Sequence, residues 1–375
     1  MSVNAKAVQI TAAVVRGKEQ PFVIEQATLR APQDDEVRVK MVATGLCHTD
    51  LIVRDQYYPV PLPAVLGHEG AGIVEAVGPN VRDLKPGDHV VLTYGQCGHC
   101  NPCRGGHGAY CKDFFGLNFG GHDGHGHTAI TDAAGAPLHD HFFAQSSFAT
   151  YALAREINAI KVPEDAPLEL LGPLGCGIQT GAGAVLNSLK VGSGSSFASY
   201  GAGAVGLSAV MAAKVAGATT IIAIDVVPSR LELAKQLGAT HVVNSRETDV
   251  VEAVRAITGG GADFALESTG RPEVLSAGIE ALGGLGVMGV VGAPKLGTTA
   301  SFDVNNLLLG GRSIRGIVEG DSVPQVFIPQ LVTLFQQGRF PFDQLVKFYP
   351  LEQINQAAED STNGITLKPI LRIAH

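Results

Sequence analysis

The chain has 375 residues, of which 45% are hydrophobic and 17% charged, which predicts a well-buried globular enzyme of two domains and argues against disorder. Its formal charge is −8 with no block of like charges, so we expect no nucleic-acid partner, because phosphate binding needs clustered Lys and Arg. No apolar run approaches the roughly 20 residues of a membrane span, and residues 1–20 lack the apolar core of a signal peptide, which predicts a cytoplasmic protein without membrane contact.

The first part of the chain predicts β structure. Apolar and charged residues alternate over 37–41, the period of a half-buried strand, and polar groups follow at its end in Gly45–Asp50. The prolines over 59–63 set an extended stretch, because proline cannot occupy a helix interior. Residues 73–77 predict a second strand that ends in a Gly-Pro-Asn turn.

Four of the six cysteines crowd into fifteen residues: Cys97, Cys100, Cys103 and Cys111. In a reducing compartment such crowding indicates metal binding rather than disulfides. Their spacing predicts a closed Cys₄ zinc site that holds a loop without a core of its own, so this zinc is expected to be structural. The competing interpretation is four unliganded thiols in a Gly-rich loop. His99 and His107 lie in the same lobe and are expected on the surface.

Three histidines follow within a short Gly-rich span, His122, His125 and His127. A third metal site is one interpretation. Because these residues have neither helical nor strand spacing, we favour a solvated loop. Apolar character returns with Phe142 and Phe143, before a predicted strand over 151–154.

From Gly175 onward, strands and helices alternate. Six such strands with helices between them predict a doubly wound parallel sheet, of the Rossmann type. The predicted strands are 195–200, 219–224, 241–244, 263–267, 286–292 and 313–318. The tail carries an amphipathic helix over 327–336 and a last strand over 368–372, which we expect to return to the first domain.

The first of these strands runs into a Gly-x-Gly-x-x-Gly sequence at Gly201, Gly203 and Gly206. The sequence follows a strand, opens a helix, and is followed at the expected distance by Asp225. Glycines let backbone N–H groups approach a pyrophosphate at a helix N-terminus. Asp225 can accept hydrogen bonds from both ribose hydroxyls and would repel a 2′-phosphate, which predicts NAD rather than NADP. The alternative is a glycine turn with a packing role that binds no cofactor.

The chain resembles the zinc-dependent medium-chain alcohol dehydrogenases over nearly its whole length. The resemblance rests on Gly-Leu-Cys-His-Thr-Asp (45–50), Gly-His-Glu-Gly-Ala-Gly (67–72), the cysteine lobe, Gly-Cys-Gly-Ile-Gln-Thr-Gly (175–181) and the glycine sequence (201–206). Two further segments, 55–63 and 140–151, resemble aryl-alcohol (benzyl alcohol) dehydrogenases. The resemblance implies an α/β protein with a mainly β, GroES-like catalytic domain formed by 1–178 and 317–375, and a Rossmann NAD-binding domain over 179–316.

The resemblance also implies a catalytic zinc held by Cys47, His68 and Cys176, with an open fourth position. This Cys₂His set is the one known for the catalytic zinc of alcohol dehydrogenases. Taken alone, His68 would be an ordinary hydrogen-bonded core histidine and Cys176 a small buried hydrophobe. The presence of all three with a Cys₄ lobe and a dinucleotide sequence favours the ligand interpretation.

Other roles follow from the same resemblance. Asp50 is expected to orient His68, Thr49 to open the proton relay, and Glu69 to approach the metal during ligand exchange. His48 and Lys368 are expected as cations near the pyrophosphate, and Arg230 near the adenosine ribose. Many relatives continue the relay with a histidine where this chain has Ile52. Proton exit through the nicotinamide ribose and proton exit through His48 both stay open.

The implied reaction is the reversible, NAD-dependent oxidation of benzyl-type primary alcohols to aldehydes by hydride transfer, with two zinc ions per chain. Phe142 and Phe143 are candidates for an apolar slot that takes a small apolar or aromatic alcohol, with ordinary core packing as the alternative. A terpene-alcohol (geraniol or perillyl type) dehydrogenase is the second candidate, and a zinc-free quinone or enone reductase the third. The family implies a homo-oligomer, a dimer or tetramer.

Overall fold

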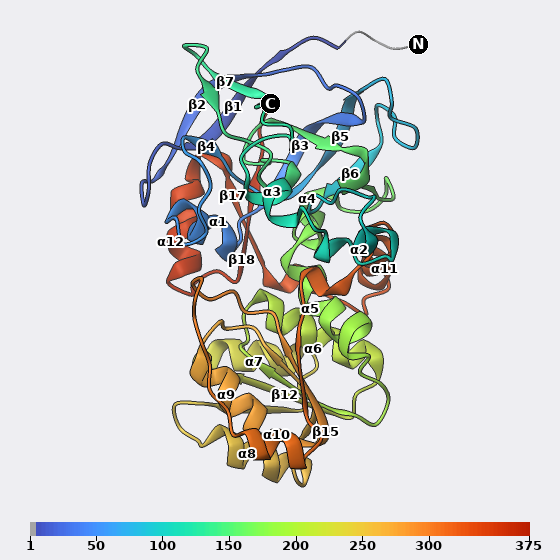
Figure 1. The fold of residues 1–375 in the computed structure, drawn as a ribbon, viewed down its shortest axis with the longest axis vertical. Helices are drawn as coiled ribbons and strands as arrows, with labels where there is room; N and C mark the ends of the chain where they lie inside the picture. Colours follow the sequence, from blue (N-terminus) through green and yellow to red (C-terminus); the bar gives the residue numbers. More distant parts are fainter. Residues whose placement is uncertain (1–4) are drawn as a thin grey trace. The chain divides into compact units, whose positions relative to one another are not determined.

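The computed structural model describes residues 5–375, and the chain divides into two compact units (Figure 1). Unit 1 contains the chain up to Cys176 together with Val323–Gln336 and Asp343–His375, and unit 2 contains Gly177–Ser322 and Gln337–Phe342. The functional division predicted from the sequence, a zinc domain over 1–178 and 317–375 and an NAD domain over 179–316, stays a prediction.

Unit 1 is mainly β and contains two sheets. The first has the order β4-β1-β2-β7-β8, and the second has the order β10-β6-β5-β3-β18-β17, with β9 also paired to β3. The strands are β1 (Val8–Val15), β2 (Phe22–Leu29), β3 (Glu36–Gly45), β4 (Ala64–Val65), β5 (Glu69–Val77), β6 (His89–Leu92), β7 (Ile130–Asp132), β8 (Pro137–Leu138), β9 (Tyr151–Arg155), β10 (Ala159–Lys161), β17 (Val346–Pro350) and β18 (Lys368–Arg372). The helices are α1 (His48–Arg54), α2 (Asn101–Arg104), α3 (Phe114–Phe119), α4 (Leu168–Leu171), α11 (Pro324–Gln336) and α12 (Ile354–Thr362).

The pairing of β3 in this second sheet brings distant segments together. Its last residue, Gly45, pairs with Glu69 of β5 on one side and with Ile370 of β18 on the other. The predicted return of the tail to the first domain is therefore confirmed. A Cβ on Gly45 would lie 2.1 Å from Oε2 of Glu69, so a side chain here would displace the carboxylate of Glu69.

Unit 2 contains the parallel sheet in the order β13-β12-β11-β14-β15-β16, and every pair of neighbours is parallel. This order confirms the predicted doubly wound topology. The strands are β11 (Ser196–Tyr200), β12 (Thr220–Asp225), β13 (His241–Asn244), β14 (Ala262–Glu267), β15 (Leu282–Val290) and β16 (Ser313–Gly316). The helices are α5 (Gly177–Gly183), α6 (Ala204–Ala216), α7 (Pro228–Leu237), α8 (Val250–Thr258), α9 (Pro272–Glu280) and α10 (Val304–Leu309). Helix α6 packs against α7, and α8 against α9, and both pairs contact the sheet.

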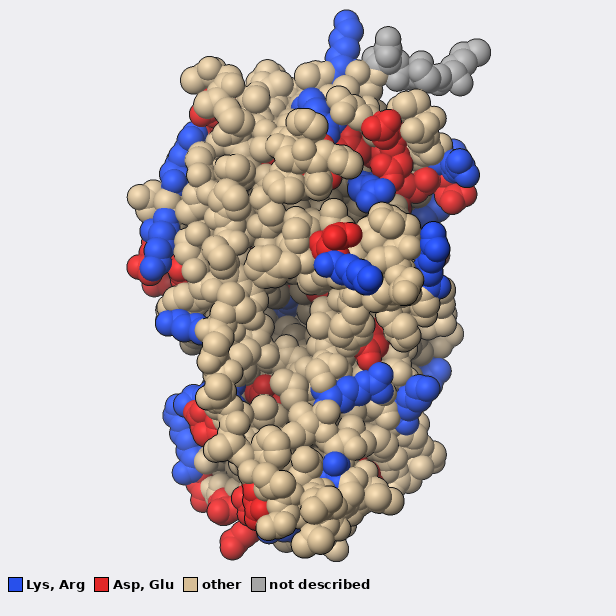
Figure 2. All heavy atoms as spheres, viewed as in Figure 1, with Lys and Arg blue, Asp and Glu red and all other residues tan. Residues whose placement is uncertain are grey.

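Among the described residues, none of the helices combines the length and apolar character needed to cross a bilayer. On the face shown in Figure 2, Lys and Arg are interspersed with Asp and Glu, rather than gathered into a basic band.

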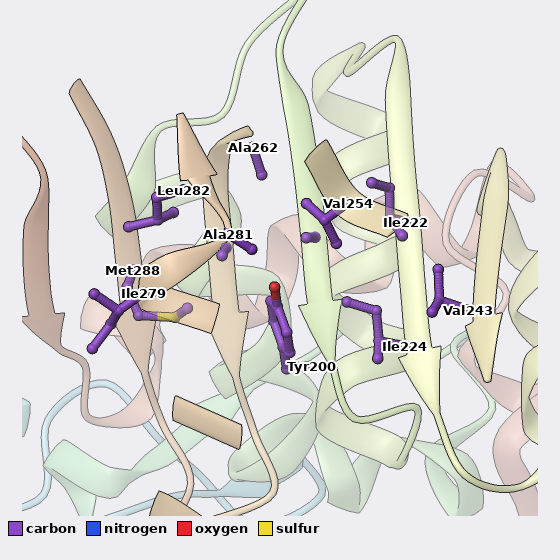
Figure 3. Packing of buried hydrophobic residues seen from close by; sticks show 12 residues of the cluster. Tyr200, Ile222, Ile224, Val243, Val254, Ala262, Ile279, Ala281, Leu282 and Met288 are labelled. Atoms are coloured by element: carbon purple, nitrogen blue, oxygen red, sulfur yellow. The ribbon is translucent and has the colours of Figure 1, made fainter. Parts of the chain in front are cut away.

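One core of unit 2 lies where α8 and α9 pack on the sheet, and it contains a tyrosine (Figure 3). Tyr200 ends β11 and packs among apolar residues such as Ile224, Ile279 and Met288. It is 1% exposed, and its hydroxyl has no hydrogen-bond partner among the described residues. Burial raises the pKa of this phenol above its ordinary value, so the hydroxyl is a neutral, unsatisfied polar group.

Tyr200→Phe is expected to raise the free energy of unfolding by about 1 kcal/mol, because it removes an unsatisfied hydroxyl and keeps the ring. Tyr349 is the matched control: it is 5% exposed, and its hydroxyl contacts Asp360 at 2.6 Å and Thr366 at 2.7 Å. Tyr349→Phe is expected to lower the free energy of unfolding by about 1–2 kcal/mol. Urea unfolding curves measure both. A destabilised Tyr200→Phe would show that the hydroxyl is satisfied in solution.

Candidate active site and cofactor site

Cys47, His68 and Cys176 come together in unit 1 with Glu69. One ligand atom from each of the four residues lies within 4.8 Å of every other. Cys47 follows β3 and His68 precedes β5, so the pairing of these two strands places the cysteine beside the histidine. His68, Glu69 and Cys176 are buried, and Cys47 is half-buried.

Asp50 is the buried carboxylate that organises this cluster. One of its oxygens accepts from the backbone N–H of Cys47 at 2.8 Å, and the other accepts from the N–H of Gly67 at 3.1 Å and lies 2.9 Å from Nδ1 of His68. Asp50 is the third residue of α1, so it closes the start of that helix while it orients the imidazole. Helix α1 itself was missed from the sequence, which predicted only a polar strand end.

Nε2 of His68 is buried and has no hydrogen-bond partner among the described residues. Because Nδ1 faces Asp50, a proton on Nδ1 leaves the lone pair of Nε2 directed at the two cysteines. The pKa of the Cys47 thiol lies well below its ordinary value, mainly through its hydrogen bond with Cys176, while burial opposes the shift. A thiolate donor, a second sulfur and an unsatisfied imidazole nitrogen match the donors that zinc prefers, so these residues fit the metal.

Glu69 is engaged by Lys368. The ammonium of Lys368 contacts both carboxylate oxygens, at 2.8 and 2.9 Å, and the two side chains are 4% and 0% exposed. Burial opposes the charge on Lys368, but Glu69 together with the nearby Cys47 and Cys176 outweighs it and raises the pKa of Lys368. The predicted contact of Lys368 with a pyrophosphate stays a prediction, and the structure adds a partner that the sequence did not indicate.

The other predicted relay residues lie on α1. The hydroxyl of Thr49 lies 3.7 Å from Sγ of Cys47. His48 is exposed at the start of the helix, and Ile52 is buried at 6% exposure.

Phe142 and Phe143 pack against the imidazole of His68. The ring of Phe143 stacks on it at a centroid distance of 4.5 Å, and the ring of Phe142 meets it edge-on at 5.3 Å. Phe119 of α3 contacts both phenylalanines, which are 1% and 4% exposed. These residues form an apolar wall beside His68, and their role toward a substrate stays a prediction.

Phe142 and Phe143 lie in a strained segment, residues 141–146. Four of its six residues, none of them glycine, have left-handed backbone angles. Their φ values are 56° for His141, 50° for Phe143, 55° for Ala144 and 55° for Ser146. Such angles are costly for residues with a side chain and persist only where surrounding contacts enforce them. The sequence did not predict this segment, because the residue types present do not indicate a positive φ.

Buried hydrogen bonds hold this segment in its strained conformation. Gln145 accepts from the N–H of Gly70 and donates to the carbonyls of His68 and Thr93, at 2.9 to 3.3 Å. Ser146 donates to the carbonyl of Val65 at 2.7 Å. Gln145 therefore ties the aromatic segment to the backbone of His68.

The four cysteines of the lobe also converge. Their sulfurs lie within 4.8 Å of one another, as the Cys₄ interpretation requires. Backbone N–H groups of Cys97 and Cys100 donate to the sulfurs of Cys111 and Cys97, both at 3.3 Å. His99 and His107 are exposed, as predicted.

In unit 2, the glycine sequence joins β11 to α6. Gly201 has φ of 101°, and a Cβ on Gly206 would lie 1.9 Å from the carbonyl oxygen of Gly201, so neither position accepts a side chain. Asp225 ends β12 and accepts from the N–H of Ala202 at 2.7 Å, which ties it to the glycine loop. Gly203 precedes α6, and Nε of Arg230 is buried without a hydrogen-bond partner among the described residues.

Comparison with known proteins gives two family matches. Residues 33–164 match the alcohol dehydrogenase GroES-like domain, and residues 204–337 match the zinc-binding dehydrogenase domain. The chain is 47% identical to the geraniol dehydrogenase of Castellaniella defragrans over 361 residues, 96% of each protein.

The chain belongs to the zinc-dependent medium-chain alcohol dehydrogenase family. Two solved structures of this family resemble it over almost their whole length. The crystal structure of an alcohol dehydrogenase zinc-binding domain protein from Burkholderia ambifaria has a TM-score of 0.98 and 77% identity, covering 99% of this chain and 100% of that one. That of benzyl alcohol dehydrogenase from Acinetobacter calcoaceticus has a TM-score of 0.95 and 65% identity, covering 98% and 100%. The resemblance predicted from the motifs is confirmed, as is the GroES-like plus Rossmann fold class.

The strained segment of this alcohol dehydrogenase begins at His141, which lies in a buried ionic network. This network makes the stability of the fold depend on pH. His141 is 7% exposed and hydrogen bonds to Asp140, and its Nε2 lies 3.8 Å from Glu36. Burial opposes protonation, but Asp140 and Glu36 raise the pKa of His141 to about 9. Burial also opposes the charge on Glu36, yet its hydrogen bonds with Arg30 and His141 lower its pKa to about 2.

Protonated His141, with its raised pKa, contributes about 3 kcal/mol to the free energy of unfolding. This contribution is complete below about pH 6.5 and is expected to disappear as the pH rises through 9. The contribution of Glu36 is present above about pH 4.5 and is lost as the pH falls toward 2. His141→Gln should therefore flatten the dependence of unfolding free energy on pH between 6.5 and 9. Urea unfolding at several pH values measures this, and an unchanged slope in the variant would contradict the assignment.

Proposed function

We propose that the chain is an NAD-dependent zinc alcohol dehydrogenase that oxidises benzyl-type primary alcohols reversibly to aldehydes. The observation that carries the proposal is the convergence of Cys47, His68 and Cys176, with Nε2 of His68 unsatisfied and Nδ1 held by Asp50. Family membership supports the alcohol dehydrogenase activity, and this donor set supports zinc as the metal.

Cys47, His68 and Cys176 would hold the catalytic zinc, and Cys97, Cys100, Cys103 and Cys111 the structural zinc. The catalytic ion, when bound, supplies Lewis acidity that lowers the pKa of an alcohol hydroxyl. Glu69, within 4.8 Å of the three ligands, is a further donor for ligand exchange. Its ion pair with Lys368 offsets the cost of a buried carboxylate, so Glu69 is held near the site without adding net charge.

Thr49 would receive the alcohol's proton. Its hydroxyl can accept a proton at Oγ1 and donate its own onward, which is the requirement for a relay. Ile52 has no titratable group, so the proton leaves Thr49 through the nicotinamide ribose or through exposed His48.

NAD would bind unit 2 through Gly201, Gly203 and Gly206, with Asp225 and Arg230 at the adenosine ribose. Asp225 retains acceptor capacity for ribose hydroxyls beyond its backbone contacts, and its charge opposes a 2′-phosphate. Unpaired Nε of Arg230 supports a ligand contact there. His48 and Lys368 stay candidate cations for the pyrophosphate.

The substrate proposal rests on the aromatic wall and on relatedness. Phe119, Phe142 and Phe143 are buried and make the surroundings of His68 apolar, which suits an aromatic alcohol better than a charged one. Identity is higher to the benzyl alcohol dehydrogenase, 65%, than to the geraniol dehydrogenase, 47%. The latter relative keeps oxidation of a terpene alcohol as the second candidate.

A substrate panel tests the proposal. We expect kcat/KM for benzyl alcohol to exceed that for geraniol by about 10-fold or more, since tighter packing of a ring against the wall lowers the barrier by more than 1.4 kcal/mol. NADP in place of NAD should reduce kcat/KM by about 100-fold, because the 2′-phosphate meets Asp225. A preference for geraniol would select the second candidate, and equal use of NADP would contradict the role of Asp225.

Two cysteine variants separate the proposed zinc ions. Cys176→Ser is expected to lower kcat at least 1,000-fold and to lose one zinc per chain, while NADH binding and the fold persist. Cys103→Ser is expected instead to lose stability, by about 2 kcal/mol or more, because the lobe has no other core. Metal analysis with thermal unfolding checks both. One zinc per wild-type chain would favour a quinone or enone reductase that lacks a catalytic zinc.

A homo-oligomer, a dimer or tetramer, is part of the proposal, and unit 2 offers a surface for it. Strand β16 is exposed at the edge of the sheet, and large apolar side chains nearby are exposed, among them Leu285 at 80%, Leu308 at 69% and Leu309 at 84%. Exposed edges and apolar patches of this kind favour pairing with a second copy. We propose the cytoplasm as the location, because none of the six cysteines in the described part of the chain forms a disulfide, which is typical of a reducing compartment.

Sedimentation velocity tests the oligomer. The wild-type chain should sediment as a dimer or tetramer, and Leu309→Asp should shift it toward the monomer, because a buried charge opposes association. Val326→Asp, exposed at 56% in unit 1, is the control and should leave the mass unchanged. A monomeric wild-type chain would contradict the oligomer.

A further inference from the structure

A hollow of about 580 Å³ lies in unit 1 beside the cysteine lobe, and metal-ligating side chains line it. The three histidines of this hollow are His99, His122 and His125, and its carboxylates include Asp113 and Asp123. Cys97, one of the four lobe cysteines, also lines it. The proposed function gives none of the histidines or carboxylates a role.

Three of these residues bring together three different donor types. A ring nitrogen of His99, a carboxylate oxygen of Asp113 and Sγ of Cys97 lie within 4.8 Å of one another. His99 and Asp113 are exposed, and Cys97 is half-buried. Borderline cations such as Zn²⁺ accept sulfur, imidazole and carboxylate donors together, so the set has the chemistry of a zinc-class site.

The ring of His99 is already oriented. Its Nδ1 lies 2.9 Å from the carbonyl oxygen of Cys97, so a proton on Nδ1 donates to that oxygen and leaves the lone pair of Nε2 available. A second ring contact of this kind is the usual accompaniment of a metal-bound histidine, because it fixes the tautomer.

Charge favours a cation at this place. Four thiolates around one Zn²⁺ would carry a net charge of about −2, which attracts a further cation. The two arginines that line the hollow are already engaged, Arg155 by Asp35 at 2.8 Å and Arg30 by Glu36 at 2.5 Å. Besides these offset charges, Lys112 is the one further lysine or arginine among the described residues that line the hollow, and it lies next to Asp113 in the chain.

We propose that Cys97, His99 and Asp113 form a third, exchangeable site for a zinc-class divalent cation, which shares the Cys97 thiolate with the Cys₄ zinc. The site is exchangeable because two of its three donors are exposed and the hollow admits water to the remaining positions. The inference rests on the Cys₄ zinc of the proposed function, because the two sites would share Cys97.

Zinc counting by native mass spectrometry tests the site on the intact holoenzyme. Dialysed wild-type chains should carry two zinc ions, and added Zn²⁺ should bring a third. His99→Ala and Asp113→Asn should each keep the two tight ions and lose the third, while His107→Ala, an exposed histidine of the same lobe outside the set, should keep all three. The absence of a third ion in the wild type, or its persistence in both variants, would overturn the site.

Co²⁺ added to the zinc-loaded enzyme tests the shared sulfur. A cobalt ion bound by Cys97 should give a sulfur-to-cobalt charge-transfer absorption that His99→Ala and Asp113→Asn lose and His107→Ala retains. Cobalt binding without this absorption would contradict the sharing of Cys97. Fewer than two zinc ions per chain after dialysis would contradict the zinc pair of the proposed function. Two ions after dialysis with no third after zinc addition would contradict only the third site.

Discussion

The contact between Asp50 and His68 is the interaction on which the candidate site depends. Both side chains are fully buried, and their 2.9 Å contact determines which nitrogen of the imidazole faces the cysteines. The same carboxylate accepts from the N–H groups of Cys47 and Gly67, so one buried side chain positions Cys47, the helix that follows it and the loop before His68. An unpaired buried charge would be costly, and this one has three partners.

Around that contact, buried polar groups position the residues proposed to bind the metal, while apolar groups exclude water. Gln145 holds the backbone of His68, and Phe142 and Phe143 cover its ring. The left-handed angles of segment 141–146 show that this cover is enforced against local preference. The Glu69–Lys368 pair extends the same principle, because β18 brings its lysine from the far end of the chain to neutralise a carboxylate beside the site.

Sequence reasoning predicted the parts of this arrangement that depend on spacing and periodicity. The six parallel strands, the return of 368–372 and the exposure of His99 and His107 follow from local pattern, and the structure confirms them. Helix α1 was missed because its seven residues have no strong period, although Asp50 three residues after Cys47 is a capping signal. The partner of Lys368 and the strain at Phe143 depend on tertiary contacts and backbone angles, which no local pattern encodes.

Anomalous diffraction at the zinc absorption edge, from crystals of the enzyme as purified, would locate the catalytic metal. We expect a peak about 2.0–2.3 Å from Sγ of Cys47, Nε2 of His68 and Sγ of Cys176, with Nδ1 of His68 still on Asp50. Full density for all three side chains with no anomalous peak among them would contradict this expectation, as would a metal bound to Nδ1.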